Sequence, residues 1–306
     1  MDEPTDFHPD LRFARYLPRT VVGSRSVGLI RKLTARSGSR PPSEGVLERV
    51  DANVTVRLFR PDGARPKAPA VLFVHGGGYL IGNAAMGDGF CRRVAGELGA
   101  VAASVEYRLA PEHPFPVPLE DCYAALRWLA ARSDVDARRI ALVGESAGGG
   151  LAAALAHLCT WSAEVSPVLQ VLSYPMLDDR TTARTYPTPG RLRLWNERSN
   201  RLGWRSYLGS ASGDTVSPLA VPARCDDMTG LAPAWIGVGT NDLFYAEDLA
   251  YAERLRQAGI RCTLRLVPGA YHGFDLVERR TPVARAFRRA RLDALDDALN
   301  GGADPA

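Results

Sequence analysis

The serine at position 146 stands in a setting that favours nucleophilic chemistry. It is the centre of the pentapeptide GESAG, residues 144–148, directly after the apolar run at 140–143, and small residues follow it at 149–156. A serine on such a sharp strand-to-helix turn has an exposed hydroxyl beside the N–H groups of the following helix. The sequence therefore predicts Ser146 as a nucleophile, which needs a base because a free hydroxyl is a weak nucleophile.

A glycine loop about 70 residues earlier predicts a place for a negatively charged oxygen. The sequence HGGGY, residues 75–79, follows the apolar run at 71–74. Glycines leave backbone N–H groups uncovered, so that they can approach a developing oxyanion closely. We expect the N–H groups of Gly76, Gly77 and Ala147 to form this oxyanion hole. The alternative is that the glycines only form a turn.

Other residues of the two motifs are expected to support the site without reacting. His75 ends a strand and is interpreted as a support of the loop that Gly78 and Tyr79 continue. Glu145 precedes the nucleophile and is interpreted as a hydrogen-bonding neighbour, since a serine hydrolase takes its base from a histidine.

Elimination among five histidines identifies a candidate base. His8 lies in a polar N-terminal arm, His75 lies in the glycine loop, and His113 lies in a proline-rich turn. His157 falls about 16 Å along the helix that follows Ser146, which is out of reach. His272 remains, in a short glycine-containing loop after the last expected strand. An ordinary loop histidine is the alternative.

A carboxylate is expected to orient the base, between the serine and the histidine in chain order. Asp242 follows the expected strand at 234–239 and is the first choice. Asp178 and Asp179 are rivals but come one strand too early, and Asp248 falls inside a helix.

Strands alternating with helices predict an α/β fold with a mostly parallel, eight-stranded, doubly wound sheet flanked by helices. The first two strands, separated by a short turn, are expected to be antiparallel. Strands are expected at 45–50, 54–59, 70–75, 101–107, 139–143, 168–174, 234–239 and 263–268. Helices are expected at 89–98, 118–131, 147–160, 245–258 and 282–300.

Two segments lie outside this alternation. Residues 1–45 hold loosely amphipathic helices and are expected to form a lid-like segment ending in a linker. Residues 178–227 are expected to be a helical insertion over the carboxyl edge of the sheet, where such folds bind ligands; a surface excursion is the alternative. The core is then 46–177 with 228–306.

Composition predicts a soluble globular chain. The chain has 306 residues, 46% hydrophobic and 24% charged, with a net charge of +4. The basic residues are interpreted as dispersed, and the cluster at 285–291 as the solvated face of the last helix, so nucleic acid is not expected as a partner. Five scattered cysteines suggest reduced thiols. The absence of a signal peptide and of an 18-residue apolar run favours a cytoplasmic protein without a membrane span.

Five motifs together resemble the bacterial hormone-sensitive-lipase family of esterases, which has the α/β-hydrolase fold. They are HGGGY at 75–79, YRLAPE at 107–112, GESAGG at 144–149, DLF at 242–244 and HGF at 272–274. The resemblance covers roughly residues 40–300. Within this family, the sequence is similar to arylesterases, acetyl esterases and heroin-esterase-like enzymes.

The resemblance implies a serine carboxylesterase acting on a small ester, with Ser146, His272 and Asp242 as its triad and with no metal or organic cofactor. It also implies that residues 1–45 and 178–227 form a helical cap, and that short acyl chains are preferred. The family often has an acid four residues after the triad aspartate, where this chain has Ala246, beside Glu247 and Asp248.

Three further expectations stay open. Arg108 and Glu112 are expected to pair across a turn braced by a proline. The last strand, at 263–268, is a plausible sheet edge through which the chain could form a homodimer. The same triad could also serve an amidase, deacetylase or lactonase, and a non-catalytic receptor on this fold is the remaining alternative.

Overall fold

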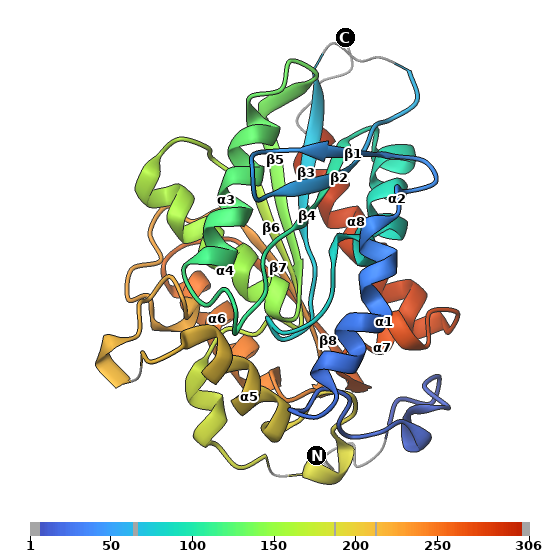
Figure 1. The fold of residues 1–306 in the computed structure, drawn as a ribbon, viewed down its shortest axis with the longest axis vertical. Coiled ribbons are helices and arrows are strands. Elements are labelled where there is room, and N and C mark those ends of the chain that lie inside the picture. The colour runs from blue at the N-terminus through green and yellow to red at the C-terminus, as the bar shows by residue number, and fades with distance from the viewer. Residues whose placement is uncertain (1–6, 64–66, 187, 212, 302–306) are drawn as a thin grey trace.

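The structure is a computed structural model that describes residues 7–63, 67–186, 188–211 and 213–301. Within these residues, one eight-stranded sheet has the order β1-β2-β4-β3-β5-β6-β7-β8; its strands are labelled in Figure 1. The strands are β1 (Val46–Arg49), β2 (Thr55–Phe59), β3 (Ala68–Val74), β4 (Val101–Glu106), β5 (Val135–Glu145), β6 (Leu169–Ser173), β7 (Ala234–Asn241) and β8 (Cys262–Tyr271). β2 is antiparallel to β1 and β4, and the later pairs are parallel, which confirms the predicted α/β architecture.

Helices cover both faces of the sheet. They are α2 (Asp88–Leu98), α3 (Val117–Ala130), α4 (Ala147–Ser162), α6 (Tyr245–Gln257), α7 (Phe274–Val277) and α8 (Pro282–Asn300). Helices α3, α4 and α6 share one apolar cluster, and α2 and α8 share the other. β3 serves both clusters by alternation, since Leu72 and Val74 face one layer and Val71 and Phe73 face the other.

Two segments of the chain that are far apart in sequence lie together over the carboxyl ends of the strands. The first holds η1 (Ala14–Tyr16) and α1 (Val27–Ser39), and the second holds α5 (Glu197–Leu208) among four short 3₁₀ helices. The short helices are η3 (Asp179–Ala183), η4 (Pro189–Arg191), η5 (Gly213–Thr215) and η6 (Pro222–Arg224); η2 (Ala84–Gly87) precedes α2.

Backbone hydrogen bonds join these two segments. The N–H of Leu194 donates to the carbonyl of Pro18, and the N–H of Val21 donates to the carbonyl of Leu194. The hydroxyl of Ser199 donates to the carbonyl of Val22. The division of the chain into a core and a two-part cap stays a prediction, which these contacts support.

The expected pair of Arg108 and Glu112 is wrong, and the expected solvated face at 285–291 is wrong for Arg291, although Arg285 and Arg289 are exposed. Arg108 pairs with Asp121, at 2.7 Å, and Glu112 pairs with Arg31, at 2.8 Å. The turn brings Arg108 to the side chain that α3 presents, and α1 supplies the partner of Glu112. Arg291 is not part of a solvated helix face, because only 3% of it is exposed.

All five cysteines are free thiols; Cys262 is half-buried and the others are buried. No helix in the described parts of the chain is long and apolar enough to cross a bilayer.

Candidate active site

Ser146 lies at the turn between β5 and α4, in a backbone conformation that side chains rarely adopt. Its φ is 55° and its ψ is −122°. The neighbouring glycines make the turn possible, because a Cβ on Gly144 would lie 2.1 Å from the carbonyl oxygen of Gly148. A Cβ on Gly148 would lie 2.2 Å from the carbonyl oxygen of Val74 on β3. Strain of this kind at one residue is typical of functional turns.

The imidazole of His272 connects the serine to an aspartate. Its Nε2 lies 2.9 Å from Oγ of Ser146, and its Nδ1 lies 2.8 Å from Oδ2 of Asp242. The other carboxylate oxygen of Asp242 accepts from the N–H of Phe244 at 3.0 Å. Because Nδ1–H donates to the carboxylate, Nε2 is left to accept the serine proton.

Aromatic rings hold the imidazole from several sides. Tyr174 and Phe244 meet it edge to face, with centroids 4.9 and 5.2 Å away, and Trp195 lies 6.5 Å away. His272 itself follows β8, and Gly273 after it has a φ of 68°, which favours glycine. The ring is therefore fixed by packing as well as by hydrogen bonds.

The glycine loop passes close to the nucleophile. A Cβ on Gly76 would lie 2.9 Å from the carbonyl oxygen of Glu145 and 3.2 Å from Cβ of Ser146. Gly77, with a φ of 125°, would clash with the backbone of Ile81 if it carried a side chain. Ala147 is the first residue of α4, where a backbone N–H has no partner within the helix. Gly76 thus lies against Ser146, Gly77 lines the same cavity as the serine, and Ala147 follows the serine directly.

A cavity of about 220 Å³ opens beside these groups. Its walls are mostly apolar and come from the glycine loop, the N-terminal segment, the segment before α5, and α7. They include Val22, Leu194, Trp195, Tyr174 and Leu276 together with Ser146 and His272.

The supporting roles expected for the glycine loop fit its contacts. His75 is fully buried, stacks on Tyr107 at 4.2 Å, and hydrogen-bonds through Nδ1 to the carbonyl of Gly76 at 2.8 Å. Burial lowers the pKa of His75 to about 4, so it is neutral at physiological pH. Gly78 abuts Trp195, and Tyr79 stacks on Tyr207 of α5 at 3.9 Å. The loop is thus held by α5 and by Trp195, which precedes α5.

Glu145 has a buried partner that sequence reasoning missed. Arg291 on α8 donates to Oε1 of Glu145 at 2.5 Å and to Oγ of Ser173 at 3.3 Å. The helical spacing could have revealed it, because Arg291 follows Phe287 and precedes Leu295 by four residues each, on the buried face.

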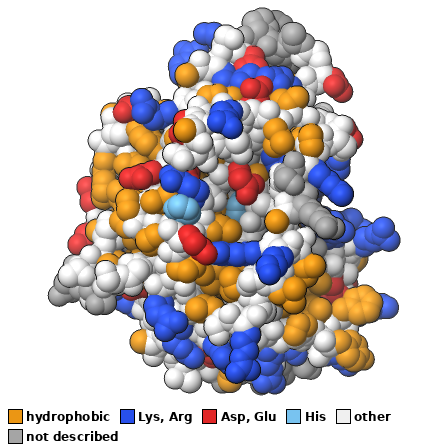
Figure 2. Space-filling view, in the orientation of Figure 1, with side chains coloured by type: hydrophobic (Ala, Val, Ile, Leu, Met, Phe, Trp, Pro, Cys, Tyr) orange, Lys and Arg blue, Asp and Glu red, His pale blue; other side chains and the backbone are white. Residues whose placement is uncertain are grey.

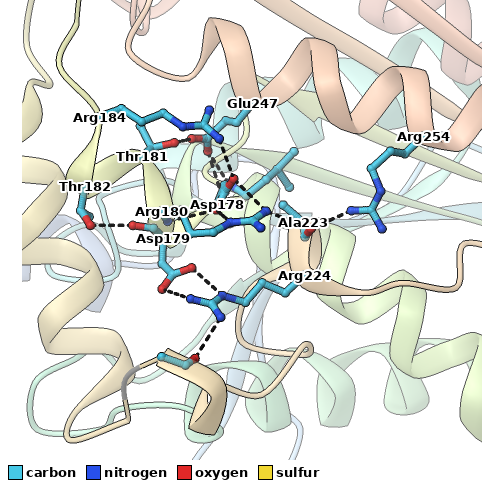
Figure 3. A network of polar contacts seen from close by, with 12 residues as sticks. Asp178, Asp179, Arg180, Thr181, Thr182, Arg184, Ala223, Arg224, Glu247 and Arg254 are labelled. Atoms are coloured by element: carbon cyan, nitrogen blue, oxygen red, sulfur yellow. Dashed lines mark hydrogen bonds and ion pairs between the residues drawn. The ribbon is translucent and has the colours of Figure 1, made fainter.

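Glu247 forms a second buried polar cluster, shown in Figure 3. Its Oε1 accepts from the N–H of Leu177 at 2.8 Å and of Asp178 at 3.1 Å, and Thr181 donates to its other oxygen. Burial raises the pKa of Glu247 to about 8. The side-chain carboxyl of Glu247, near the start of α6, therefore holds the start of the 178–227 segment close to the loop of Asp242.

The rival side chains lie elsewhere. Asp178 pairs with Arg180, and Asp179 pairs with Arg224 (Figure 3). His157 hydrogen-bonds to Tyr251, and burial lowers its pKa to about 4. The described residues hold no cluster of three or more side chains suited to bind a metal ion.

Comparison with known proteins agrees with the observed fold. A family model described as the alpha/beta hydrolase fold matches residues 71–276. The chain is 33% identical over 253 residues to "Carboxylesterase NlhH" of Mycobacterium tuberculosis, covering 81% of this chain and 79% of that protein. It is 33% identical to "Ethyl acetate hydrolase" of Pseudomonas putida, over 72% of this chain and 70% of the relative.

Solved structures give the same result. "Bacterial Heroin Esterase" superimposes with a TM-score of 0.85 and 34% identity, covering 96% of this chain and 98% of the other. An esterase of Pyrobaculum calidifontis superimposes with a TM-score of 0.82 and 29% identity, over 95% and 98%.

Proposed function

The chain belongs to the alpha/beta hydrolase fold family, among the hormone-sensitive-lipase-like esterases, and from this premise we propose a serine carboxylesterase that uses Ser146, His272 and Asp242. It is a carboxylic ester hydrolase, as its relatives named above are. The observation that carries the proposed triad is the chain of two hydrogen bonds, 2.9 and 2.8 Å long, through the two nitrogens of one imidazole.

The proposed reaction has two acyl-transfer steps. His272 takes the proton of Ser146 as the oxygen attacks the ester carbonyl, and then protonates the leaving alcohol or phenol. Asp242 holds the ring in the required tautomer and stabilises the imidazolium. Water, deprotonated by the same histidine, releases the acid from the acyl-enzyme.

The oxyanion of each tetrahedral intermediate is proposed to bind the N–H groups of Gly76, Gly77 and Ala147. Such donors are fixed before the reaction and cost no reorganisation, and removing one typically costs about 10²–10³ in kcat. The close approach of the glycine loop to Ser146 supports this assignment.

Short acyl chains or small aryl groups are the proposed substrates. The cavity beside Ser146 has a volume of about 220 Å³, smaller than the roughly 300–1,000 Å³ of drug-sized ligand sites. Its apolar walls, which include Trp195, favour an uncharged ester.

Hydrolysis of p-nitrophenyl acetate, butyrate, octanoate and laurate tests the proposal. The Ser146→Ala variant should lose at least about 10⁴ in kcat, whereas Ser162→Ala, at the far end of α4, should match wild type. Wild type should turn over acetate or butyrate fastest. Equal rates for wild type and Ser146→Ala would show that another group is the nucleophile, and a preference for laurate would contradict the short-chain assignment.

A homodimer through β8 is a further prediction. β8 lies at the edge of the sheet, where unpaired N–H and C=O groups tend to pair with another chain, and its Leu266 is 37% exposed. A dimer is expected in analytical ultracentrifugation at micromolar concentration, and a monomer there would reject the prediction.

A further inference from the structure

The positive charge of this chain is concentrated in two segments. Residues 7–40 and 184–213 hold 14 of the 38 lysines and arginines but only two of the 34 aspartates and glutamates, Asp10 and Glu197. The rest of the chain holds 24 basic and 32 acidic residues and is therefore net negative. The interpretation of the basic residues as dispersed is wrong.

These two segments meet in the folded chain, where residues 18–22 lie against residues 194–199. They are joined by the hydrogen bonds of Leu194 and Val22 described above, and Asn196 on one hydrogen-bonds to Thr20 on the other. Figure 2 shows Lys and Arg side chains gathered along the lower edge of the molecule, where the N-terminal segment and α5 lie in Figure 1.

Many of these basic side chains have no acidic partner. The side chains of Arg12, Arg15 and Arg25 form no hydrogen bond or ion pair within the described residues, and neither do those of the three arginines at 198, 201 and 205 on α5. The three on α5 recur at helical spacing along its exposed side and line a depression beside Gly23. Their charge is available to an external anion.

Large apolar side chains stand exposed between these arginines. Phe13 is 65% exposed and Tyr16 is 77% exposed, and they alternate with Arg12 and Arg15. On α1, Leu29 and Leu33 are one helical turn apart and are 61% and 70% exposed. The same segment therefore offers both cations and apolar side chains to the outside.

The apolar exposure continues to the mouth of the active-site cavity. Val21, Met86, Leu276 and Val277 line this cavity and are each between 38% and 49% exposed. The N–H of Phe13 donates to the carboxylate of Glu278, so the exposed ring stands next to this rim.

We propose that residues 12–33 and the arginines of α5 dock the protein onto an anionic lipid bilayer, with the mouth of the active-site cavity facing the lipid. Arginines that flank a row of exposed aromatic and aliphatic side chains match the anionic headgroups and the acyl boundary of such a surface. An ester dissolved in the membrane then reaches the cavity without crossing bulk water.

Charge and side-chain type favour this occupant over two others. A second copy of the chain would bring arginines against arginines, which costs free energy for like charges in contact. Single-stranded nucleic acid binds through cations and stacked aromatic rings, but the exposed aliphatic residues Leu29, Leu33, Leu276 and Val277 offer no stacking surface.

Vesicles made of ether-linked lipids test the proposal separately from the esterase function, because these lipids contain no carboxylic ester bond. The full-length protein should co-sediment with vesicles of diether phosphatidylcholine mixed with diether phosphatidylglycerol, and much less with phosphatidylcholine alone. Raising the ionic strength should weaken this binding, since salt screens exposed charges.

Two double variants probe the surface. Arg12→Glu/Arg15→Glu should lower the partition coefficient by more than about 25-fold, at roughly fivefold for each positive charge removed. Phe13→Ser/Tyr16→Ser should lower it by roughly tenfold, because two aromatic rings lose contact with the acyl region.

Matched controls change the same residue types elsewhere. Lys67→Glu/Arg138→Glu alters exposed charges just before β3 and near the start of β5, at the end of the sheet away from Ser146. Trp161→Ser alters a 57% exposed ring about 22 Å along α4 from Ser146. Both should bind vesicles within about twofold of wild type.

Four binding results would overturn the proposal, and a mass measurement provides a fifth. The protein could fail to bind anionic vesicles, or it could bind neutral vesicles equally well. The control variants could lose as much vesicle binding as the two double variants do. A single-stranded oligonucleotide could bind the protein more tightly and displace it from the vesicles. A change of oligomeric mass in Phe13→Ser/Tyr16→Ser would instead assign the surface to contacts between copies. A loss of binding with full p-nitrophenyl acetate hydrolysis in Arg12→Glu/Arg15→Glu would separate docking from catalysis.

Discussion

Two pairs of buried carboxyl groups lie next to the proposed triad, and they differ in whether a cation is buried with them. Glu145 directly precedes Ser146, and Asp275 lies three residues after His272. Arg291 donates a hydrogen bond to Glu145, and its positive charge also acts on Asp275. Glu247 and Asp248 follow Asp242 on α6, and the arginines near them, Arg180 and Arg184, pair with Asp178 instead (Figure 3).

The difference appears in the pKa of Asp275 on one side and in those of Glu247 and Asp248 on the other. Burial raises the pKa of Asp275, but Arg291 opposes the shift, and the result is about 6. Burial raises the pKa of Glu247 to about 8 and that of Asp248 well above its usual range. The first pair therefore forms an ionic cluster with Arg291, whereas burial without a cation favours the protonated form of the second pair.

The two carboxyl clusters lie at different positions in the fold. The ionic cluster lies beside the nucleophile turn, where Arg291 of α8 reaches Glu145. The ring of Tyr174 packs on His272, and its hydroxyl donates to Asp275. The protonated cluster joins α6 to the start of the 178–227 segment through backbone N–H groups. A buried charge needs its partner, whereas a neutral carboxyl needs only hydrogen bonds.

Replacing Arg291 with methionine is expected to have the largest effect. The change keeps an aliphatic chain but leaves Glu145 and Asp275 buried without a cation, which should cost about 3–5 kcal/mol of stability. Denaturant unfolding of purified protein measures the loss. Arg289→Met on the exposed side of α8 is the control and should change stability by less than about 1 kcal/mol. Equal stability of the two variants would mean that the carboxyls beside Arg291 are already neutral.

The same comparison shows how far the sequence could predict this molecule. The eight strands and the meeting of Ser146, Asp242 and His272 were predictable, because each residue follows an apolar strand and parallel strands end at one edge of the sheet. Helix α8 was predicted with its observed bounds, from Pro282 to Asn300.

Side-chain partners across the fold were not predictable from local pattern. Arg108 was assigned to Glu112 in its own turn, yet it pairs with Asp121, because α3 presents that carboxylate beside it. Arg291 was assigned to solvent, since no pattern named Glu145 as its partner. Such pairings depend on how elements distant in sequence pack, and a one-dimensional pattern does not specify this.

Glu145→Gln is expected to have a smaller effect than Arg291→Met. The amide still accepts from Arg291, and Asp275 remains to balance the charge, so the cost should be about 1–3 kcal/mol. The double variant Glu145→Gln/Arg291→Met should lose less stability than the sum of the single losses, as measured in a double-mutant cycle. Additive losses would show that the two side chains do not interact energetically.

Glu247 should make stability fall as pH rises. Its pKa is about 8 in the folded chain, above the usual value of 4.5, so the folded state binds more protons than the unfolded state between these pH values. The stabilisation is present below about pH 4.5 and is lost as the pH rises through about 8, by at most about 1.4 kcal/mol per pH unit.

Unfolding of wild type, Glu247→Gln and Glu253→Gln at about pH 5 and about pH 8.5 measures this contribution. Glu253 is exposed on the same helix and serves as the control. Wild type should lose stability relative to Glu247→Gln between the two pH values, and Glu253→Gln should follow wild type. A stability difference between wild type and Glu247→Gln that does not change with pH would show that Glu247 keeps one protonation state.

Asp248→Asn is expected to have the smallest effect, and it tests the protonated pair most directly. Asp248 is fully buried, and within the described residues neither of its carboxyl oxygens has a hydrogen-bond partner. Burial and the neighbouring carboxyls of Glu247 and Asp242 raise its pKa and favour the neutral form, so an amide of the same shape should change stability by less than about 0.5 kcal/mol at neutral pH. The rate of p-nitrophenyl acetate hydrolysis should also be unchanged, since a neutral group exerts little field on Asp242. A gain of more than about 1 kcal/mol would instead identify Asp248 as a buried, unpaired charge, and the contrast between the two carboxyl pairs would then be wrong.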